Sequence, residues 1–371
     1  MRFFISSILF LTVTTPSLRA QSISSTKPIR VAIVGLVHGH VKGFLSALPK
    51  NPSAQLVAIV EPNTSLAKQY ASQYHLQQSL FDTDLEHMLT TQHPDAVLVY
   101  TTIQDHRRVI EAAARHNISS MVEKPLSTTM EDALAIRTAA REHHVHVLVN
   151  YETTWYASNA EAINEAESGK LGDLRKIVVH DGHEGPKEIG VGPEWLPWLT
   201  DPVQNGAGAL FDFGCYGADL ATLLMHGQPP LSVTAVMQTD KPATYPHVDD
   251  DATIILRYPK AQAVIMPSWN WPFARKDMEV YGATGYTITV AADNLRVRYQ
   301  GEKVESQKPA PPLPDNQKDS LTYLAAVLHG QIKSTDDLSA LDTNMVVMQI
   351  LDAARTSAET GRTIELKPLP R

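Results

Sequence analysis

The sequence has a single cysteine and no cluster of basic residues, and each absence excludes a class of protein. Cys215 alone cannot form an internal disulfide, and no CxxC or CxxH spacing is available for structural zinc. The 32 Lys and Arg residues are outnumbered by 40 Asp and Glu residues, so the net charge is −8. Because a nucleic acid backbone is held by clustered cations, no nucleic acid partner is expected.

Long apolar runs are also scarce, and the one at the start of the chain is short. Residues 3–13 are apolar, follow Arg2 and precede a segment that ends in the small residue Ala20. This pattern is typical of a secretory signal peptide cleaved near Ala20, whereas a membrane anchor requires a longer run. We therefore expect a periplasmic or secreted mature protein with no stable membrane insertion after cleavage of residues 1–20.

The 371 residues are enough for two domains, and the first shows alternating strand and helix patterns. Predicted strands lie at 29–34, 55–60, 96–100, 120–122 and 145–149, and predicted helices at 41–48, 66–74, 85–91, 106–116 and 130–142. This alternation predicts an α/β domain over residues 29–150, built on a doubly wound parallel sheet. Ligands of such sheets bind at the carboxyl ends of the strands, where Gly35, Glu61, Thr101, Glu123 and Asn150 fall.

The glycine turn after the first strand departs from the GxGxxG pattern of dinucleotide sites. Gly35 is in place, but Val37 and His40 occupy the positions of the other two glycines, and Gly39 is out of register. The turn alone therefore also fits an ordinary strand-to-helix connection. Glu61 follows the first strand's glycine at about the spacing of a ribose-binding carboxylate, and its charge favours NAD over NADP.

The second half of the chain, residues 151–371, has a different pattern. After a predicted helix at 159–168, strand-like runs follow at 174–180, 232–238, 252–258, 261–268, 278–281, 286–290 and 296–299. With few helices between them, these runs predict a large open sheet that is mostly antiparallel. Predicted helices at 209–225 and 321–328 are expected to cover it, residues 343–358 to form a core-packing helix, and the proline-rich residues 308–314 to form a linker.

Several short motifs resemble those of the Gfo/Idh/MocA oxidoreductases. Glu123-Lys124-Pro125 follows a predicted strand as the EKP motif does in that family, and Thr101 with His106 resembles its TPNxxH stretch, although Thr102 and Ile103 replace Pro and Asn. Further motifs in the family's order lie at 169–172, 206–216, 281–285 and 357–362. The resemblance implies a Rossmann domain, a C-terminal α/β domain with an open sheet, a nicotinamide cofactor, a carbohydrate or polyol between the domains, and a homo-oligomer.

The resemblance also implies a catalytic set. Lys124 matches the family's lysine and Asp212 its aspartate, while Tyr216 stands where most members carry histidine, as in the glucose-fructose oxidoreductase branch. Removal of a hydride from a carbinol carbon also requires a base for the hydroxyl proton, and Lys124 and Tyr216 are the candidates. We expect neighbouring cations and burial to lower their pKa values. The plainer interpretation of Asp212 and Tyr216 is a helix with a buried, hydrogen-bonded tyrosine.

The remaining candidates are grouped by the ligand that they are expected to contact. Cofactor candidates are Gly35, Val37, His38, Gly39, His40, Glu61, Thr101, His106, Glu123 and Lys124. Substrate candidates are Tyr151, His180, Asp181, His183, Trp269 and Trp271. The stretch from His180 to Glu184 contains metal-ligand types, but we expect contact with sugar hydroxyls and no metal. Arg275 and Lys276 fit either an acidic sugar or, more simply, exposed charges.

These observations favour an NAD-dependent oxidoreductase that acts on a carbohydrate. Outside the cytoplasm a dissociated cofactor could not be recycled, so we expect NAD to stay bound. The reaction would then be redox-neutral, either a hydride transfer between two sugars or a transient oxidation that assists cleavage of a glycoside. The alternatives are a non-catalytic carbohydrate-binding protein on a Rossmann relic, suggested by the altered glycine turn, and a metal-dependent hydrolase built on residues 180–184.

Overall fold

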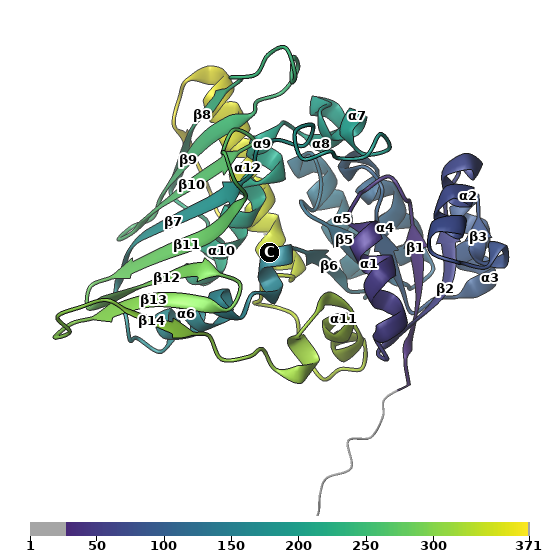
Figure 1. Cartoon of the computed structure of the whole chain (residues 1–371), viewed down its shortest axis with the longest axis horizontal. Coiled ribbons are helices and arrows are strands. Elements are labelled where there is room, and N and C mark those ends of the chain that lie inside the picture. The colour runs from purple at the N-terminus through teal and green to yellow at the C-terminus, as the bar shows by residue number, and fades with distance from the viewer. Residues whose placement is uncertain (1–26, 370–371) are drawn as a thin grey trace, which may run out of the picture.

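The computed structural model describes residues 27–369 and contains two sheets that face each other across a layer of helices (Figure 1). The first sheet has the order β3-β2-β1-β4-β5-β6, and its strands are all parallel. Its strands are β1 (Ile29–Val34), β2 (Ala54–Val60), β3 (Phe81–Asp82), β4 (Ala96–Val99), β5 (Ser119–Glu123) and β6 (Val147–Asn150). The predicted parallel sheet is therefore confirmed.

Five helices connect these strands. They are α1 (Val41–Ala47), α2 (Thr64–Gln73), α3 (Leu85–Gln92), α4 (His106–Arg115) and α5 (Met130–Glu142), with short 3₁₀ turns at Leu48–Lys50, Gln78–Leu80 and Ile103–Asp105. The side chains of Asn63, Asp84 and Thr129 accept backbone N–H bonds at the starts of α2, α3 and α5. Such caps satisfy N–H groups that have no partner within the helix, and so they fix where each helix begins.

The second sheet has the order β14-β13-β12-β11-β7-β10-β9-β8-β15. Its strands are β7 (Leu174–Gly182), β8 (Ser232–Gln238), β9 (Asp251–Arg257), β10 (Gln262–Ser268), β11 (Arg275–Gly282), β12 (Gly285–Ala291), β13 (Asn294–Tyr299), β14 (Ser306–Pro309) and β15 (Ile364–Glu365). Only β7 and β10 pair in parallel within this described sheet, which confirms the mostly antiparallel prediction. The linker prediction was partly wrong, because residues 306–309 form an edge strand, where proline is tolerated.

Helices cover the face of the second sheet that looks toward the first (Figure 1). They are α6 (Ala157–Glu167), α9 (Ala209–Asp212), α10 (Gly214–Leu224) and α12 (Leu341–Thr360), while α7 (Leu196–Leu199) and α8 (Pro202–Asn205) lie in the connection from β7. The single helix predicted at 209–225 is in fact two helices that meet at Phe213. The long helix α12 is largely buried, as predicted, and contacts α5 and β6 as well as β8 and α10.

Helix α11 (Ser320–Leu328) packs against the first sheet, although it follows the second sheet in the chain. Leu321, Tyr323 and Leu324 are buried in the same apolar cluster as Ile33 and Leu98 of β1 and β4. The core of the N-terminal domain is thus completed by a segment that lies beyond its predicted end at residue 150. Two more 3₁₀ turns are Glu152–Trp155, which follows β6, and Asp315–Gln317, which precedes α11.

Residues 1–26 lie outside the described part of the chain, and they include the expected signal peptide at 1–20. In the described part, no helix combines the length and the apolar character that crossing a membrane requires.

Candidate active site

The centre of the candidate site is an ion pair between Lys124 and Asp212. Lys124 directly follows β5, and its side chain is 5% exposed, while that of Asp212 is 8% exposed. The Lys124 ammonium donates to Oδ1 of Asp212 and, at 2.8 Å, to the main-chain oxygen of the same residue. Oδ2 of Asp212 accepts a 2.9 Å bond from Nε1 of Trp269. The pair therefore joins the edge of the first sheet to the second.

The break between α9 and α10 is what allows the main chain of Asp212 to take part. In a continuous helix, the N–H of Tyr216 would bond to the carbonyl of Asp212, four residues earlier. Instead it bonds to the carbonyl of Phe213, at 3.2 Å, and the Asp212 carbonyl is left to accept from Lys124. The break between α9 and α10, which the helical pattern did not predict, thus frees one of the two Asp212 oxygens that accept from Lys124.

The expected lowering of pKa values at the catalytic candidates was wrong. Burial alone lowers the pKa of Lys124, but Asp212, together with Cys215 and Glu123, outweighs burial and raises that pKa above its ordinary value. Burial alone raises the pKa of Asp212, but Lys124, together with His183 and Trp269, outweighs burial and lowers that pKa below its ordinary value. Burial, reinforced by Glu152, holds the pKa of Tyr216 well above its usual range. At neutral pH the site therefore presents an ammonium group and an uncharged phenol.

A second lysine, Lys276, also lies close to the ring of Tyr216. The Nζ atoms of Lys124 and Lys276 each lie 5.2 Å from the centroid of that ring, and Lys276 also pairs with Glu152. The Lys276 side chain is 21% exposed, so it belongs to the site and is not one of the exposed charges that the simpler interpretation implied. Tyr151 packs edge-on against Tyr216 and donates its hydroxyl to Asn344 at 2.7 Å. Tyr151 therefore packs against Tyr216, and its own hydroxyl is already hydrogen-bonded to Asn344.

Strand β7 divides the predicted substrate residues between two faces. The strand continues to Gly182, so His180 and Asp181 point to opposite sides of the sheet. His180 lies on the outer face, where its Nδ1 is 3.0 Å from Asp277 and its ring is near Trp271. The structure therefore places His180 and Trp271 on the face of the sheet away from Lys124, and it divides the potential metal ligands of residues 180–184 between the two faces.

Asp181 and His183 lie on the inner side, near the ion pair. The carboxyl of Asp181 is buried, and neither of its oxygens has a hydrogen-bond partner among the described residues. Burial raises its pKa well above the ordinary value, which favours the neutral acid, a form that can both donate and accept a hydrogen bond. Nδ1 of His183 accepts from the N–H of Gly185 at 2.8 Å, which leaves Nε2 as the donor of a neutral ring.

The adenosine end of a dinucleotide fits a cavity of about 260 Å³ at the carboxyl ends of β1, β2 and β4. It is lined by Gly35, Val37, Glu61 and Thr101 among others. Gly35 has φ +84°, and a Cβ there would lie 2.7 Å from the Thr101 side chain, so only glycine is accommodated. The Glu61 oxygens each accept one backbone N–H bond of 2.9 Å, from Leu36 and Asn63. Each oxygen keeps a lone pair for a ribose hydroxyl.

A tryptophan from the connection after β7 covers the glycine turn. The ring of Trp195 packs on His38, with 4.8 Å between centroids, and Nε1 of Trp198 donates to the Val37 carbonyl at 3.3 Å. A Cβ on Gly39 would lie 2.0 Å from the Trp195 ring, so this contact requires glycine at position 39. We call residues 186–205 the strap, because they reach from the second sheet to the first.

Gly39→Ala is expected to displace the strap and to destabilise the protein by about 1–3 kcal/mol, as overpacking of a filled site does. Urea unfolding followed by tryptophan fluorescence measures this change. Gly43→Ala is the matched control, since a Cβ at that position in α1 meets nothing within 4 Å. Equal stability of the two variants would contradict the contact, and Trp195→Leu combined with Gly39→Ala should restore part of the loss.

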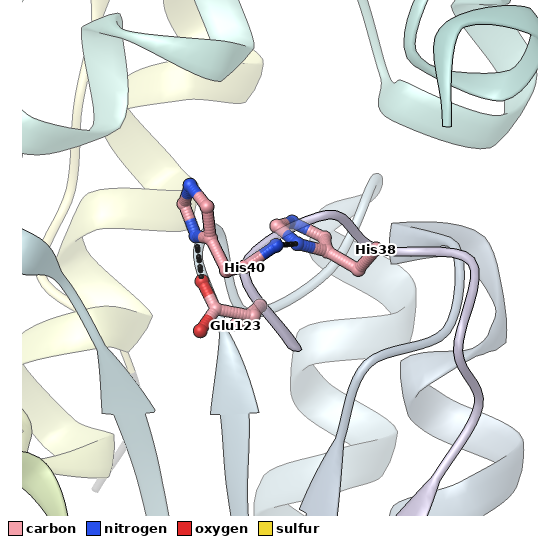
Figure 2. A group of neighbouring side chains, drawn as sticks. All are labelled: His38, His40 and Glu123. Carbon is pink, nitrogen blue, oxygen red and sulfur yellow. Dashed lines mark hydrogen bonds and ion pairs between the residues drawn. The ribbon is translucent and has the colours of Figure 1, made fainter. Parts of the chain in front are cut away.

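His40, Glu123 and His38 lie together at the domain boundary, as Figure 2 shows. Nδ1 of His40 is 2.8 Å from Oε2 of Glu123, while His38 is buried beneath the strap and burial lowers its pKa well below the usual value. The third histidine predicted at the cofactor site, His106, is also buried and bonds to the Leu126 carbonyl at 3.2 Å. It therefore positions the segment after Lys124.

Comparisons with known proteins agree with this geometry. Residues 29–151 match the sequence profile of the oxidoreductase family with an NAD-binding Rossmann fold, and residues 159–288 match that of the GFO/IDH/MocA C-terminal domain. The chain belongs to the Gfo/Idh/MocA oxidoreductase family. Its first domain is thus an NAD-binding Rossmann domain, and the fold and cofactor expected from the sequence are confirmed.

Individual relatives of this family member are distant. A trans-1,2-dihydrobenzene-1,2-diol dehydrogenase of Macaca fuscata fuscata is 23% identical over 62% of this chain, and the match spans only 64% of that relative's length. A 1,5-anhydro-D-fructose reductase of Ensifer adhaerens is 24% identical over 84% of this chain and 91% of its own.

Solved structures share the fold at similarly low identity. The aldose-aldose oxidoreductase of Caulobacter crescentus, solved with glycerol, has a TM-score of 0.77 at 23% identity and covers 91% of this chain and 100% of its own. An inositol dehydrogenase homologue of Azotobacter vinelandii, solved with NAD⁺, has a TM-score of 0.79 at 18% identity and covers 92% and 98%.

Sequence reasoning missed Glu152 and the two tryptophans of the strap as parts of the site, and it named Lys276 only as a ligand of an acidic sugar or an exposed charge. One signal was present for the strap, since Gly39 in an otherwise bulky turn indicates close approach of another group. For Glu152 and Lys276 no local signal exists, because their pairing joins positions 124 residues apart.

Proposed function

We propose that this protein oxidises a secondary hydroxyl of a carbohydrate with a retained NAD and later returns the hydride, so that the overall reaction is redox-neutral. The observation that carries this proposal is the Lys124–Asp212 pair, which lies at the edge of the NAD-binding sheet and faces Tyr216 and Asp181. Donors and acceptors of this kind suit a polyhydroxylated ring rather than an apolar substrate.

When bound, NAD supplies the hydride acceptor, and Glu61, Gly35 and Thr101 are the residues that would hold its adenosine end. The proton transfers are carried out by side chains of the protein. The neutral form of Lys124 accepts the proton of the reacting hydroxyl, and the ammonium form returns it when the ketone is reduced. Asp212 keeps the lysine at that position through two contacts. Tyr216 and Asp181, both protonated, donate to sugar oxygens.

Retention of the cofactor is supported by the strap. Trp195 and Trp198 reach across the turn that would approach the pyrophosphate, and Glu194 anchors the strap to Lys42 of α1 through a 2.6 Å ion pair. Release of a dinucleotide would require these contacts to open. The hydride from one substrate is then still available for the next step, which is the condition for redox-neutral chemistry.

The decisive experiment is release of the cofactor by denaturation. We expect protein purified without residues 1–20 to carry stoichiometric NAD, seen by absorbance and mass after unfolding. NAD that binds but washes away would instead indicate an ordinary dehydrogenase. Absence of NAD together with no binding of added NAD or NADP would contradict the proposal and favour a carbohydrate-binding protein.

We also propose a periplasmic or secreted location and a homo-oligomer. The location rests on residues 1–20. The oligomer rests on the outer face of the second sheet, where Val236 and Ile255 are 58% and 42% exposed on neighbouring strands. Sedimentation of the mature protein would show the oligomer, and a monomer at all concentrations would contradict it.

A further inference from the structure

We propose that Asp249 is a positioning residue for the oxidation, because it holds the helical turn that carries Asp212 and thereby fixes the place of Lys124. This inference rests on the proposed function and deepens it, since it identifies what keeps the proton acceptor in position. Asp249 lies in the connection between β8 and β9, and its side chain bonds to the segment just before Asp212.

Both carboxylate oxygens of Asp249 bond to the start of α9. Oδ1 accepts from the N–H of Gly208 and Oδ2 from the N–H of Leu210, each at 2.7 Å, and the residue is only 7% exposed. The main-chain oxygen of Asp249 accepts a third bond, of 3.0 Å, from the N–H of Ala209. Such N–H groups have no partner within a helix. Asp249 therefore determines where α9 begins.

The contact between Asp249 and α9 is passed to the lysine over a single turn. A Cβ on Gly208 would lie 1.8 Å from the Asp249 carbonyl oxygen, so the approach requires glycine there. Asp212 ends α9, and its N–H bonds back to the Gly208 carbonyl at 3.1 Å. The two Asp212 oxygens that accept from Lys124 belong to the side chain and the main chain of this turn. Displacement of the turn would therefore displace both acceptors.

The next residue, Asp250, supports the other contact of Asp212. The main-chain oxygen of Asp250 accepts the N–H of Trp269 at 2.7 Å, and Nε1 of Trp269 donates to Oδ2 of Asp212 at 2.9 Å. The Asp250 carboxylate is itself fixed by the N–H groups of Asp240 and Lys241, at 2.8 and 2.7 Å. Consecutive residues of one connection thus support both the backbone and the carboxylate of Asp212.

Asp249 accepts both side-chain bonds only as a carboxylate. Burial raises its pKa to about 6, and the charge of Asp250 adds to this effect, while the N–H bonds from Leu210 and Gly208 oppose it. A protonated carboxyl carries an O–H donor, so one of the two N–H groups then loses its acceptor. The turn should therefore loosen as pH falls through about 6.

Other titratable groups surround α9, and one of them could respond in the same pH range. Strand β10, which packs on α9, has no titratable residue. The other charged or titratable residues around α9 are Asp251 of β9, Cys215, Tyr216 and Asp219 of α10, Asp352 and Arg355 of α12, Lys124 after β5, and His183 and His247 in neighbouring connections. Burial lowers the pKa of His183, whose charge acts on Asp212, so a test must distinguish His183 from Asp249.

The indole N–H of Trp269 reports the position of Asp212. In mature protein labelled with ¹⁵N-tryptophan, its NMR signal, assigned with Trp269→Phe, should move with pH about a midpoint near 6. Asp249→Asn should hold the signal at its low-pH position throughout, because an amide also has a single acceptor oxygen. Asp251→Asn is the matched control, since Asp251 begins β9 with the opposite orientation to the buried Ala252, and it should titrate as the wild type does.

The rate of hydride transfer gives a second measurement. Single-turnover reduction of bound NAD by methyl β-glucoside is followed between about pH 5 and 8. At pH 7 we expect Asp249→Asn to be slower by about 10–10²-fold, the effect of a displaced reacting group, with unchanged NAD content. Below pH 6 the wild-type rate should fall more steeply than that of the variant until the two rates meet. Asp251→Asn should follow the wild type.

The outcomes distinguish the role of Asp249 from the proposed function. Equal rates in wild type and Asp249→Asn across the pH range would overturn the role of Asp249 and leave the proposed function standing. A Trp269 signal that titrates in wild type but not in Asp249→Asn, in a protein whose bound NAD no carbohydrate reduces, would support the role and contradict the proposed function. A titration that persists in Asp249→Asn would assign it to another group and overturn the inference.

The wild-type protein decides the matter if circular dichroism shows that Asp249→Asn does not fold. A Trp269 signal that stays flat between about pH 5 and 8 would overturn the inference. A titration near pH 6 that survives in His183→Gln would support it, because the competing histidine is then absent.

Discussion

Lys124→Met should slow hydride transfer to bound NAD by about 10²–10⁴-fold, the range that loss of a positioned acid–base group produces. Methionine keeps the length of the side chain and removes the amine. Stopped-flow measurement of nicotinamide reduction in a single turnover isolates this step from substrate release. Because Lys124 does not line the cavity assigned to the cofactor's adenosine end, the NAD content should stay the same.

Lys170→Met is the control for this variant. Lys170 also pairs with a buried carboxylate, Glu165, and its Nζ lies 4.1 Å from the centroid of the Tyr299 ring, but this cluster lies where α6 packs against β13, outside the candidate site. It should transfer hydride at the wild-type rate. A Lys124→Met protein that transfers hydride as fast as this control would show that the lysine is not the proton acceptor.

The rate of sugar oxidation by the wild-type protein should rise with pH. Asp212 raises the pKa of Lys124, so only a small fraction of the amine is neutral at neutral pH. That fraction, and with it the rate of sugar oxidation, should rise about tenfold per pH unit below the pKa. A rate that stays flat across the alkaline range would mean that another group accepts the proton.

Asp212→Ala should lower the free energy of unfolding by about 3–5 kcal/mol at neutral pH, because it leaves a buried ammonium without its counter-charge. The variant also removes the acceptor for Nε1 of Trp269. Urea unfolding measures the change. The double variant Lys124→Met, Asp212→Leu should recover most of the loss, since no charge is then buried.

Glu86→Ala controls for the removal of an ion pair as such. Glu86 bonds Arg115 and His116 on the surface and is 54% exposed, so its loss should cost about 0–1 kcal/mol. Similar destabilisation in Asp212→Ala and Glu86→Ala would mean that the active-site pair is not buried in solution.

The penalty in Asp212→Ala should itself depend on pH. The pKa of Asp212 is lowered by folding, so its stabilising contribution is present above the ordinary aspartate pKa and is lost as pH falls through the lowered value. The pKa of Lys124 is raised, so its contribution is present below the ordinary lysine pKa and is lost as pH rises through the raised value. The difference between variant and wild type should therefore be largest between these limits.

Local patterns in the sequence predicted most of the fold. Buried parallel strands such as 29–34 and 96–100 are continuous apolar runs, and the helices between them have a clear period, so their order determines the sheet. The strands of the second sheet were predicted as well, except for the two edge strands β14 and β15. The position of Lys124 and Glu123 at the edge of the first sheet followed from the same alternation.

The predictions that failed concern the face of the sheet on which a residue lies and contacts between residues far apart in the chain. The strand around His180 was expected to end there, but it runs two residues further, and in a strand each residue points opposite to its neighbour. The break in the helix over 209–225 was not predicted, and the contact that uses the freed Asp212 carbonyl comes from Lys124, 88 positions away. Residues far apart in the chain leave no periodic signal when they meet.

The return of α11 to the first sheet has a consequence for synthesis on the ribosome. Domains generally fold as units, with the N-terminal one first. Here Leu321, Tyr323 and Leu324 belong to the core around β1, yet they emerge only after every strand from β7 to β14 has been made. The first domain to be translated is therefore the last to be completed. Until then, the apolar face that awaits α11 is open on the nascent chain.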